Sequence, residues 1–340
     1  MNKKSFFRLS LILLLILICF YLLLKPYYDF STKVINVSPA AIIFGNKELK
    51  STHNQTNILI LGISGPGHDG PDLSDSIIVA SIDFNRKQLN TISIPRDIWS
   101  DTLKDKINSA YAYGAVKQTT GGLVLSKAEV AAIVGIPIHY AVVIDFSEFE
   151  KLIDYLGGIT INIENSFTDK LFPISGKEAD ECNNDPEYKC RYETVSFVKG
   201  LNHLNGKTAL KYVRSRNGNN NEGNDFARSS RQQKVINAIK EKIISFIYYP
   251  DVGRLTKLYR NIDRLLIRDI PNQSLAILAK KMIISKNYLA NQISLPEDLF
   301  IVPEYSDYDG KYVLIPKSGN FDALKTYIEC RTKQSNCKIE

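Results

Sequence analysis

One apolar run near the N-terminus limits where the rest of the chain can fold. Residues 9–24 carry no charge, and the eight residues before them hold two lysines and one arginine. The run is slightly shorter than the ~20 residues of a spanning helix, but the aliphatic stems of the flanking Arg8 and Lys25 extend its usable length. Because basic residues flank its N-terminal end, we expect residues 1–8 to stay cytoplasmic and the chain after residue 25 to lie outside.

A cleaved signal peptide is the alternative to an uncleaved anchor. A signal peptide has an apolar core of ~7–15 residues that is followed closely by a cleavage site of small residues. The segment Ser38-Pro39-Ala40 comes too late and contains a proline. We therefore expect a single-pass protein of the cell membrane, with its transmembrane helix at residues 9–25.

The spacing of the cysteines agrees with a domain outside the cytoplasm, and the net charge indicates its partners. Cys182 with Cys190 and Cys330 with Cys337 form two close pairs, a spacing that suits local disulfides in an oxidising space, whereas zinc favours C-x-x-C. The 43 basic and 36 acidic residues give a net charge of +7. For an exported chain this balance predicts membrane lipid or phosphorylated lipids and polymers as partners, and no nucleic acid.

The pattern of apolar runs predicts one layered α/β domain at residues 57–340, behind a juxtamembrane stalk at 26–56. Several expected strands are continuous apolar runs, which is typical of a mostly buried sheet. We expect strands at 57–62, 76–83, 89–94, 140–144 and 159–163, and helices at 126–134, 147–155, 206–211 and 228–247. Helices at 255–265, 273–284 and 321–330 and a strand pair near 300–302 and 312–315 follow.

Arginines and glutamine gather on either side of a polar loop at residues 217–224. Read as a strand, residues 212–216 place two arginines on one face, and a helix opening at Asp225 places three polar side chains on one face. The set is Arg214, Arg216, Arg228, Arg231 and Gln232. Guanidinium groups that converge from two elements are typical of a phosphate or diphosphate site. A solvated basic face is the alternative, and Arg231 could equally point outward.

Carboxylates at strand ends form a second candidate set. Asp75 lies just before a buried strand, and Arg96 follows the neighbouring strand. Mg²⁺ is usually held by one or two carboxylates together with substrate phosphates and water, so Asp75 is a candidate metal ligand. Asp69 or Asp72 could supply the second carboxylate. The alternative is that Asp75 caps a turn and Asp72 is merely solvated.

Other reactive patterns are weaker. Lys106 and Asn108 could contact phosphate or sugar, or could simply open a helix. The four histidines lack metal spacing, and residues 62–65 do not form a nucleophile elbow. A serine hydrolase and a histidine-based site are therefore not expected.

In their order along the chain, these segments resemble the LytR-CpsA-Psr family. The resemblance rests on residues 59–62, 74–76, 93–97, 106–114, 145–146, 156–158, 204–210, 212–216, 225–228 and 231–233. It implies a three-layer α/β/α sandwich with a mostly buried mixed sheet, with its core motifs within 57–247 and one N-terminal transmembrane helix. The sheet and helices of such a domain enclose a long apolar pocket for a polyprenyl chain.

The resemblance implies a Mg²⁺-dependent phosphotransferase that moves a glycopolymer, such as teichoic acid or capsule, from a polyprenyl-diphosphate carrier to peptidoglycan, with pyrophosphatase as a side activity. By motif position Asp75 is the metal carboxylate, with Asp72 as a second candidate. The implied diphosphate ligands are Arg96, Lys106, Arg214, Arg216, Arg228 and Gln232, and Asp75, Arg96, Arg214 and Arg216 are the implied catalytic residues. A hydrolase of the same diphosphate and a non-catalytic lipid-binding or regulatory protein are the alternatives.

Two features depart from the family pattern. The family usually carries an aspartate where this chain has Ser64, so Asp69 or Asp72 would have to compensate, or Ser64 would bind metal through water. The insertion that holds Cys182 and Cys190 is also longer than the common form. The base for the incoming hydroxyl is left open between Asp75 and Asp97.

Overall fold

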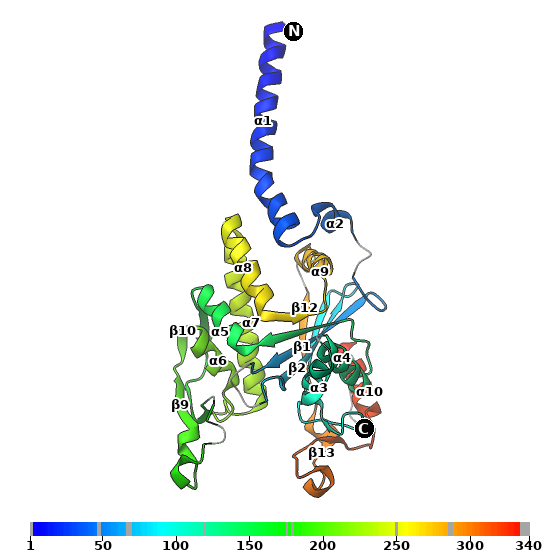
Figure 1. Cartoon of the computed structure of the whole chain (residues 1–340), viewed down its shortest axis with the longest axis vertical. Helices are drawn as coiled ribbons and strands as arrows, with labels where there is room; N and C mark the ends of the chain where they lie inside the picture. Colours follow the sequence, from blue (N-terminus) through cyan, green and yellow to red (C-terminus); the bar gives the residue numbers. More distant parts are fainter. Residues whose placement is uncertain are drawn as a thin grey trace.

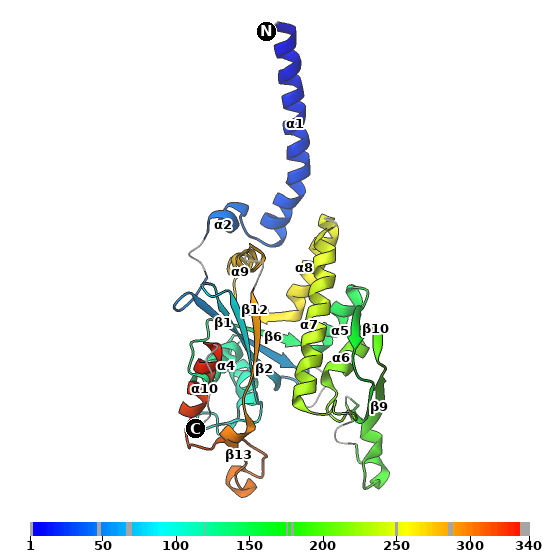
Figure 2. The same ribbon diagram turned by 180° about the vertical axis from the view of Figure 1, so that it is seen from behind.

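A long N-terminal helix projects from a folded domain (Figures 1 and 2). The computed structural model describes residues 3–45, 49–65, 70–118, 120–174, 176–177, 180–248, 251–284 and 288–333. Helix α1 (Lys3–Asp29) exposes its apolar side chains along its length, and the segment Ser10–Val34 is long and apolar enough to cross a membrane. The helix is therefore longer than the predicted span but contains all of it.

The stalk is folded onto the domain rather than extended. A π-helical turn η1 (Phe30–Val34) and helix α2 (Pro39–Phe44) follow α1. Helix α9 (Asn272–Ile284) holds this segment, because the Asn272 amide donates to the Ile35 carbonyl at 2.6 Å and the Lys280 amine donates to the Ile42 carbonyl at 3.0 Å. The start of the domain is thus fixed close to the end of α1.

A mixed six-stranded sheet forms the centre of the domain. Its strands, in spatial order, are β11 (Leu266–Arg268), β6 (Tyr140–Asp145), β1 (Gln55–Ile63), β2 (Ser74–Asp83), β3 (Gln88–Ile94) and β12 (Leu289–Ser294). Strand β1 is parallel to β6 and antiparallel to β2, and β3 is parallel to β12. Short connections explain the antiparallel pairs β1–β2 and β2–β3, whereas β11 and β12 join the two edges from much farther along the chain.

Helices cover both faces of this sheet, as predicted. On one face Leu59, Leu61 and Val79 pack against α3 (Ala110–Lys117), α4 (Gly121–Val134) and α10 (Asp322–Thr332), and this core is almost fully closed to water. On the other face α9 covers one end of the sheet. Near the opposite end Ile78, Ile144 and Phe146 are only half-buried. One face of the sheet is therefore closed and the other is partly open.

A second core builds the lobe that carries the arginines. It contains α5 (Phe146–Tyr155), β7 (Ile159–Ile163), β8 (Phe167–Pro173), β9 (Tyr192–Phe197), β10 (Gly200–Leu204), α6 (Gly206–Arg214) and α7 (Asp225–Tyr248), with α8 (Val252–Leu265) beside it. Cys182 and Cys190 are joined in a disulfide within this lobe. The other predicted pair involves Cys337, which lies outside the described residues.

The predicted strand at residues 212–216 is wrong. Helix α6 begins behind Asn205, whose side chain accepts a hydrogen bond from the Thr208 amide, and it continues through Arg214. Ala209, Tyr212 and Val213 are buried at helical spacing, so the apolar contacts favour helix over strand. Arg214 therefore ends a helix and Arg216 lies in the following loop.

Candidate functional site

A cavity of about 1090 Å³ lies where several strands end. Strands β1, β3, β6 and β12 run in the same direction, because β1 and β3 are both antiparallel to β2, and each has a parallel neighbour. Their carboxyl ends therefore meet at one edge of the sheet. Polar side chains that follow these strands are brought together there, which is the usual place for a ligand in an α/β sheet.

The sheet contributes one wall of the cavity, which we call the sheet wall: Ser64, Asp75, Arg96 and Asp97. A β-bulge positions Asp75, because Gly62 pairs with Ser76 and Ile63 with Ser74, leaving Asp75 without a partner across the strands. Such bulges re-aim a side chain at the end of a ladder. The Ser64 hydroxyl donates to Asp75 Oδ2 at 3.0 Å, and Arg96 forms an ion pair with Asp75 Oδ1.

The charges of the sheet wall continue behind the cavity. Arg96 Nε lies 3.7 Å from Asp97 Oδ2, and Lys106 Nζ donates to Asp97 Oδ1 at 2.8 Å. Lys106 does not line the cavity; it supports Asp97 from behind. Asn108 is also behind the wall, where its backbone amide donates to the Arg96 carbonyl at 3.3 Å.

The arginine lobe contributes the facing wall, which we call the arginine wall: Arg214, Arg216, Arg228 and Gln232. Arg214 ends α6, Arg216 follows in the loop, and the other two lie one turn apart near the start of α7. The Arg214 guanidinium lies 5.9 Å from the centre of the Phe146 ring. Guanidinium groups from the two walls thus face one cavity.

A buried carboxylate that sequence reasoning missed holds the loop of this wall. Asp169 of β8 is fully buried. Its Oδ2 accepts hydrogen bonds from the Ser215 hydroxyl at 2.7 Å and from the backbone amides of Arg216 and Asn217 at 3.1 Å each. The two-residue spacing of Asp169 from the apolar Phe167 was the available signal, since an aspartate on an apolar strand face must find donors.

Arg231 does not belong to the arginine wall. Its side chain is 2% exposed and donates to the Tyr212 carbonyl at 2.9 Å, the Ser215 carbonyl at 2.6 Å and Glu222 Oε2 at 2.8 Å. Burial lowers the pKa of Arg231, and the Glu222 carboxylate opposes this shift. Burial also raises the pKa of the neighbouring Tyr212 to about 12. Arg228 and Gln232 line the cavity, whereas Arg231, which was predicted to share their face, points into the interior.

The described part of the chain does not place either carboxylate predicted as the second metal ligand on the sheet wall. Asp69 lies outside the described residues, and Asp72 is exposed in the turn before β2 and does not line the cavity. Its charge adds to burial in raising the pKa of Tyr111. Asp75 with the Ser64 hydroxyl still fits Mg²⁺, because this ion commonly takes one protein carboxylate and completes its shell with phosphate oxygens and water.

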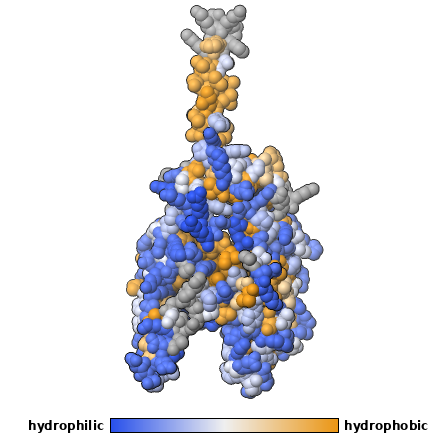
Figure 3. Space-filling view, in the orientation of Figure 1, coloured by the Kyte–Doolittle hydropathy of each residue, from blue (hydrophilic) through white to orange (hydrophobic). Residues whose placement is uncertain are grey.

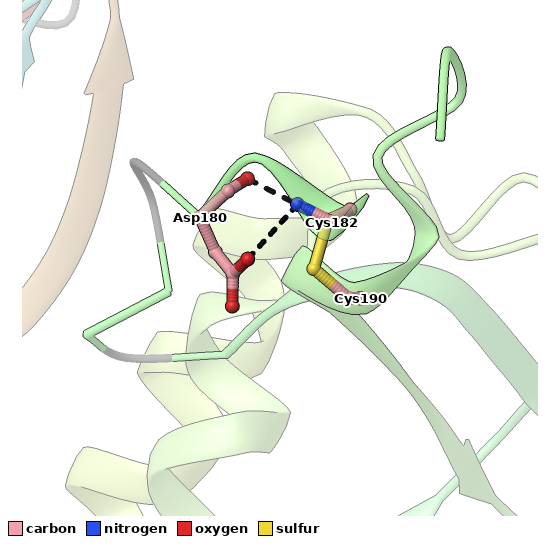
Figure 4. A group of neighbouring side chains, drawn as sticks. All are labelled: Asp180, Cys182 and Cys190. Atoms are coloured by element: carbon pink, nitrogen blue, oxygen red, sulfur yellow. Dashed lines mark hydrogen bonds between the residues drawn. A yellow bond between two sulfur atoms is a disulfide. The ribbon is translucent and has the colours of Figure 1, made fainter. Parts of the chain in front are cut away.

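One other cluster resembles a metal site within the part of the chain that the structure describes. Asp180, Cys182 and Cys190 lie together in the arginine lobe (Figure 4). The two sulfur atoms are bonded to each other, so neither is a thiolate ligand, and the Asp180 carboxylate accepts the Cys182 amide at 2.9 Å. This cluster is a disulfide-linked turn.

The sequence is similar to one protein family and to named relatives. The profile of the LytR_cpsA_psr family matches residues 29–329. The polyisoprenyl-teichoic acid–peptidoglycan teichoic acid transferase TagU of Bacillus cereus is 30% identical over 231 residues, which are 66% of this chain and 65% of TagU. The chain thus spans just under two thirds of that relative. Regulatory protein MsrR of Staphylococcus aureus is 29% identical over 281 residues, 80% of this chain and 74% of MsrR.

Solved structures share the fold. B. subtilis TagV superposes with a TM-score of 0.55 at 24% identity, covering 84% of this chain and 100% of TagV. The protein YwtF (TagT) with bound octaprenyl pyrophosphate gives a TM-score of 0.51 at 22% identity, covering 84% and 92% of the two chains. At these identities the likeness establishes the architecture.

Proposed function

The chain belongs to the LytR-CpsA-Psr family, and on that premise we propose that it is a membrane-anchored phosphotransferase. The donor is a glycopolymer on a polyprenyl-diphosphate carrier, and the acceptor is a hydroxyl group of peptidoglycan. The N-terminus is cytoplasmic and the domain lies outside, in keeping with the basic residues that precede the apolar run.

One observation carries the proposal: guanidinium groups from two walls face the same cavity. Arg96 comes from the sheet wall, and Arg214, Arg216 and Arg228 come from the arginine wall. Planar guanidinium groups bind phosphate oxygens in pairs, so several of them around one cavity suit a diphosphate. The bound octaprenyl pyrophosphate in the TagT structure and the transferase name of TagU agree with this ligand class.

An apolar part of the cavity suits the polyprenyl chain of the donor. Ile78, Phe146 and Val213 line the cavity beside the arginines, and Ile78 and Phe146 lie at the half-open end of the sheet. The closed face offers no such space, since its side chains are almost fully buried. An isoprenoid chain would cover the half-buried side chains and gain free energy from the apolar surface removed from water.

The proposed reaction is a displacement at phosphorus. The acceptor oxygen forms a bond to the phosphorus that carries the glycopolymer, and the bridging P–O bond breaks with its electron pair going to polyprenyl phosphate. The arginines neutralise charge on both phosphates and hold them in line. Asp75 or Asp97 accepts the proton of the hydroxyl group, and Arg96 contacts both carboxylates. With water as acceptor the same displacement is the pyrophosphatase side activity.

Mg²⁺ is the proposed cofactor. Asp75 and Ser64 would hold it beside the diphosphate, where it would add positive charge to that of the arginines. The remaining ligands would be phosphate oxygens and water.

The experiment uses the full chain in detergent micelles, a polyprenyl-diphosphate-linked oligosaccharide and soluble peptidoglycan fragments. We expect transfer by the wild type, and a loss of about 10²-fold or more in Arg214→Ala and Asp75→Ala. Arg86→Ala is the matched control, because Arg86 lies in the turn between β2 and β3, at the other end of the sheet. Equal rates in all four proteins, or no transfer by the wild type, would contradict the proposal.

A second function is favoured by Ser64 and by the relative MsrR, which is named a regulatory protein. A protein with one metal carboxylate fewer could bind polyprenyl diphosphate without turning it over. This reading predicts stoichiometric bound lipid and no Mg²⁺-dependent product in the same assay. Release of phosphate-bearing product without acceptor would instead identify a hydrolase.

A further inference from the structure

The cavity extends past the sheet wall onto a lobe formed by the C-terminal part of the chain. This distal lobe, residues 295–316, contains η5 (Glu297–Leu299), β13 (Phe300–Ile301), η6 (Tyr305–Tyr308) and β14 (Ile315–Pro316). It lies at the end of the molecule opposite α1 (Figures 1 and 2). Figure 3 shows this end divided into two lobes with a gap between them. The distal lobe is therefore a part of the cavity wall that lies away from α1.

Large apolar side chains of the distal lobe are open to water at the cavity. Ile301, Val302 and Tyr312 line it and are 43%, 47% and 46% exposed, and the nearby Tyr305 is 52% exposed. Clustered exposed side chains of this kind mark interaction sites more often than single ones do. The carboxylate of Glu297 lines the same surface, so the surface combines rings, aliphatic groups and hydrogen-bonding groups.

The distal lobe is fixed to the sheet wall through the backbone. The Leu314 amide donates to the Asp97 carbonyl at 2.9 Å, and the Trp99 amide donates to the Leu314 carbonyl at 3.0 Å. Lys311 Nζ also donates to Asp105 Oδ1 at 2.8 Å. Tyr312 lies between these two attachments, so a ligand that rests on its ring is held at a constant position relative to the sheet wall.

We propose that Tyr312 and Tyr305, together with Ile301 and Val302, form the binding surface for the saccharide chain that receives the glycopolymer. A sugar ring presents C–H groups on its faces and hydroxyl groups at its edge, which matches rings and aliphatic groups beside a carboxylate. The inference rests on the proposed function, and it names the place of the second substrate. The donor is held in the membrane by its lipid, whereas the distal lobe faces the opposite way.

An isoprenoid chain fits this surface less well. Its whole length is apolar and gains most where side chains enclose it, but Ile301, Val302, Tyr305 and Tyr312 are about half exposed and charged residues lie between them in the sequence. The half-open face of the sheet, with Ile78 and Phe146, is the better site for that chain. The two substrates then reach the charged walls from different sides.

The first measurement is binding of soluble, uncrosslinked peptidoglycan glycan fragments to the full chain in detergent micelles, without donor. We expect Tyr312→Ala and Tyr305→Ala each to raise the Kd roughly two- to tenfold, and Tyr312→Phe to restore it. Tyr188→Ala is the matched control, because Tyr188 is 43% exposed on the other lobe and does not line the cavity. Unchanged affinity in both alanine variants would overturn the proposal.

The second measurement shows whether the surface binds the acceptor or the donor. In the transfer assay Tyr312→Ala should raise KM for the acceptor by the same factor and leave KM for the donor unchanged. A rise in the donor KM alone would assign the surface to the donor and overturn the proposal. Because glycan binding is measured without turnover, a wild type that binds glycan but transfers nothing would contradict the proposed function and leave this inference supported.

Discussion

The two walls of the cavity hold their charged side chains in different ways. On the sheet wall the polar side chains contact one another in a row. Ser64 donates a hydrogen bond to Asp75, and Arg96 forms ion pairs with Asp75 and Asp97. On the arginine wall two buried charges, Asp169 and Arg231, lie behind the lining and bind the backbone of the loop. The first wall is a chain of side-chain contacts, and the second is a loop of fixed shape.

Because of this difference, we expect the two walls to respond differently when a ligand binds. A phosphate or metal ion at the sheet wall must exchange contacts with Asp75 or Arg96, so this wall rearranges when it binds. The arginine wall is shaped before the ligand arrives, since its backbone donors are already satisfied. Groups that are oriented in advance stabilise a developing charge without a reorganisation cost. We therefore expect substitutions on the sheet wall to affect turnover, and those behind the arginine wall to affect folding and donor binding.

The largest effect is expected for Asp75→Asn. The amide keeps the size of the side chain and can still accept from Ser64, but it carries no charge and cannot take a proton. We expect transfer to fall by about 10²–10⁴-fold, with donor binding reduced far less. A transfer assay beside donor titration checks this. A parallel loss of donor affinity and turnover would show that the sheet wall acts mainly in binding.

Arg231→Met and Arg228→Met form a matched pair on one helix. Arg231→Met leaves the Glu222 carboxylate and three backbone carbonyl groups without their donor, and removing one member of a buried ion pair costs about 3–5 kcal/mol. Arg228→Met should leave the free energy of unfolding nearly unchanged and weaken donor binding. Denaturant unfolding and donor titration of both variants test the contrast. Similar stability in the two variants would mean that Arg231 is not the internal support described here.

Asp169→Asn should have a smaller effect. The Asp169 carboxylate accepts hydrogen bonds from Ser215, Arg216, Asn217 and Leu171. The amide of an asparagine can accept only some of these hydrogen bonds. We expect a loss of about 1–3 kcal/mol in unfolding free energy and a higher KM for the donor. Ser215→Ala removes one of these bonds and should show a fraction of the effect. An unchanged donor KM in a folded Asp169→Asn protein would contradict the idea that this carboxylate shapes the arginine wall.

The smallest effect is expected for Ser64→Asp, which adds the carboxylate that the family pattern has at this position. Without metal the new charge lies next to Asp75 and should lower stability through repulsion. With Mg²⁺ both carboxylates can bind, so stability should rise with metal concentration. Thermal unfolding with Mg²⁺ and with a chelator checks this. If the melting temperature does not depend on Mg²⁺, the sheet wall is not the metal site.

The sequence predicted all four lining residues of the arginine wall, but it predicted the arrangement of the sheet wall better than the shape of the arginine wall. Asp75 and Arg96 flank apolar strands, and strands of known direction bring their ends together, so their proximity follows from local patterns. The shape of the arginine wall depends on contacts between distant segments. Arg231 is three positions from Arg228, about 60° away around the helix axis, and only the packing of α7 on Phe167 and Tyr212 decides that it turns inward.

Other parts of the fold could not be predicted from the local sequence pattern either. Residues 212–214 have a strand-like composition but join α6, because their apolar side chains pack at helical spacing. The edge strand β12 is half polar and mostly exposed, so its sequence carries little strand signal, and pairing with β3 determines it. The role of Asp169 required knowing which loop lies opposite β8.

Native mass spectrometry of the full chain with a polyprenyl diphosphate tests most directly whether this cavity binds the lipid-linked donor. We expect one bound lipid per chain for the wild type and for Arg86→Ala, and a large loss of the bound form in the double variant Arg214→Ala/Arg228→Ala. Retention of the lipid by the double variant, or no bound lipid in the wild type, would contradict the assignment of this cavity to the lipid-linked donor.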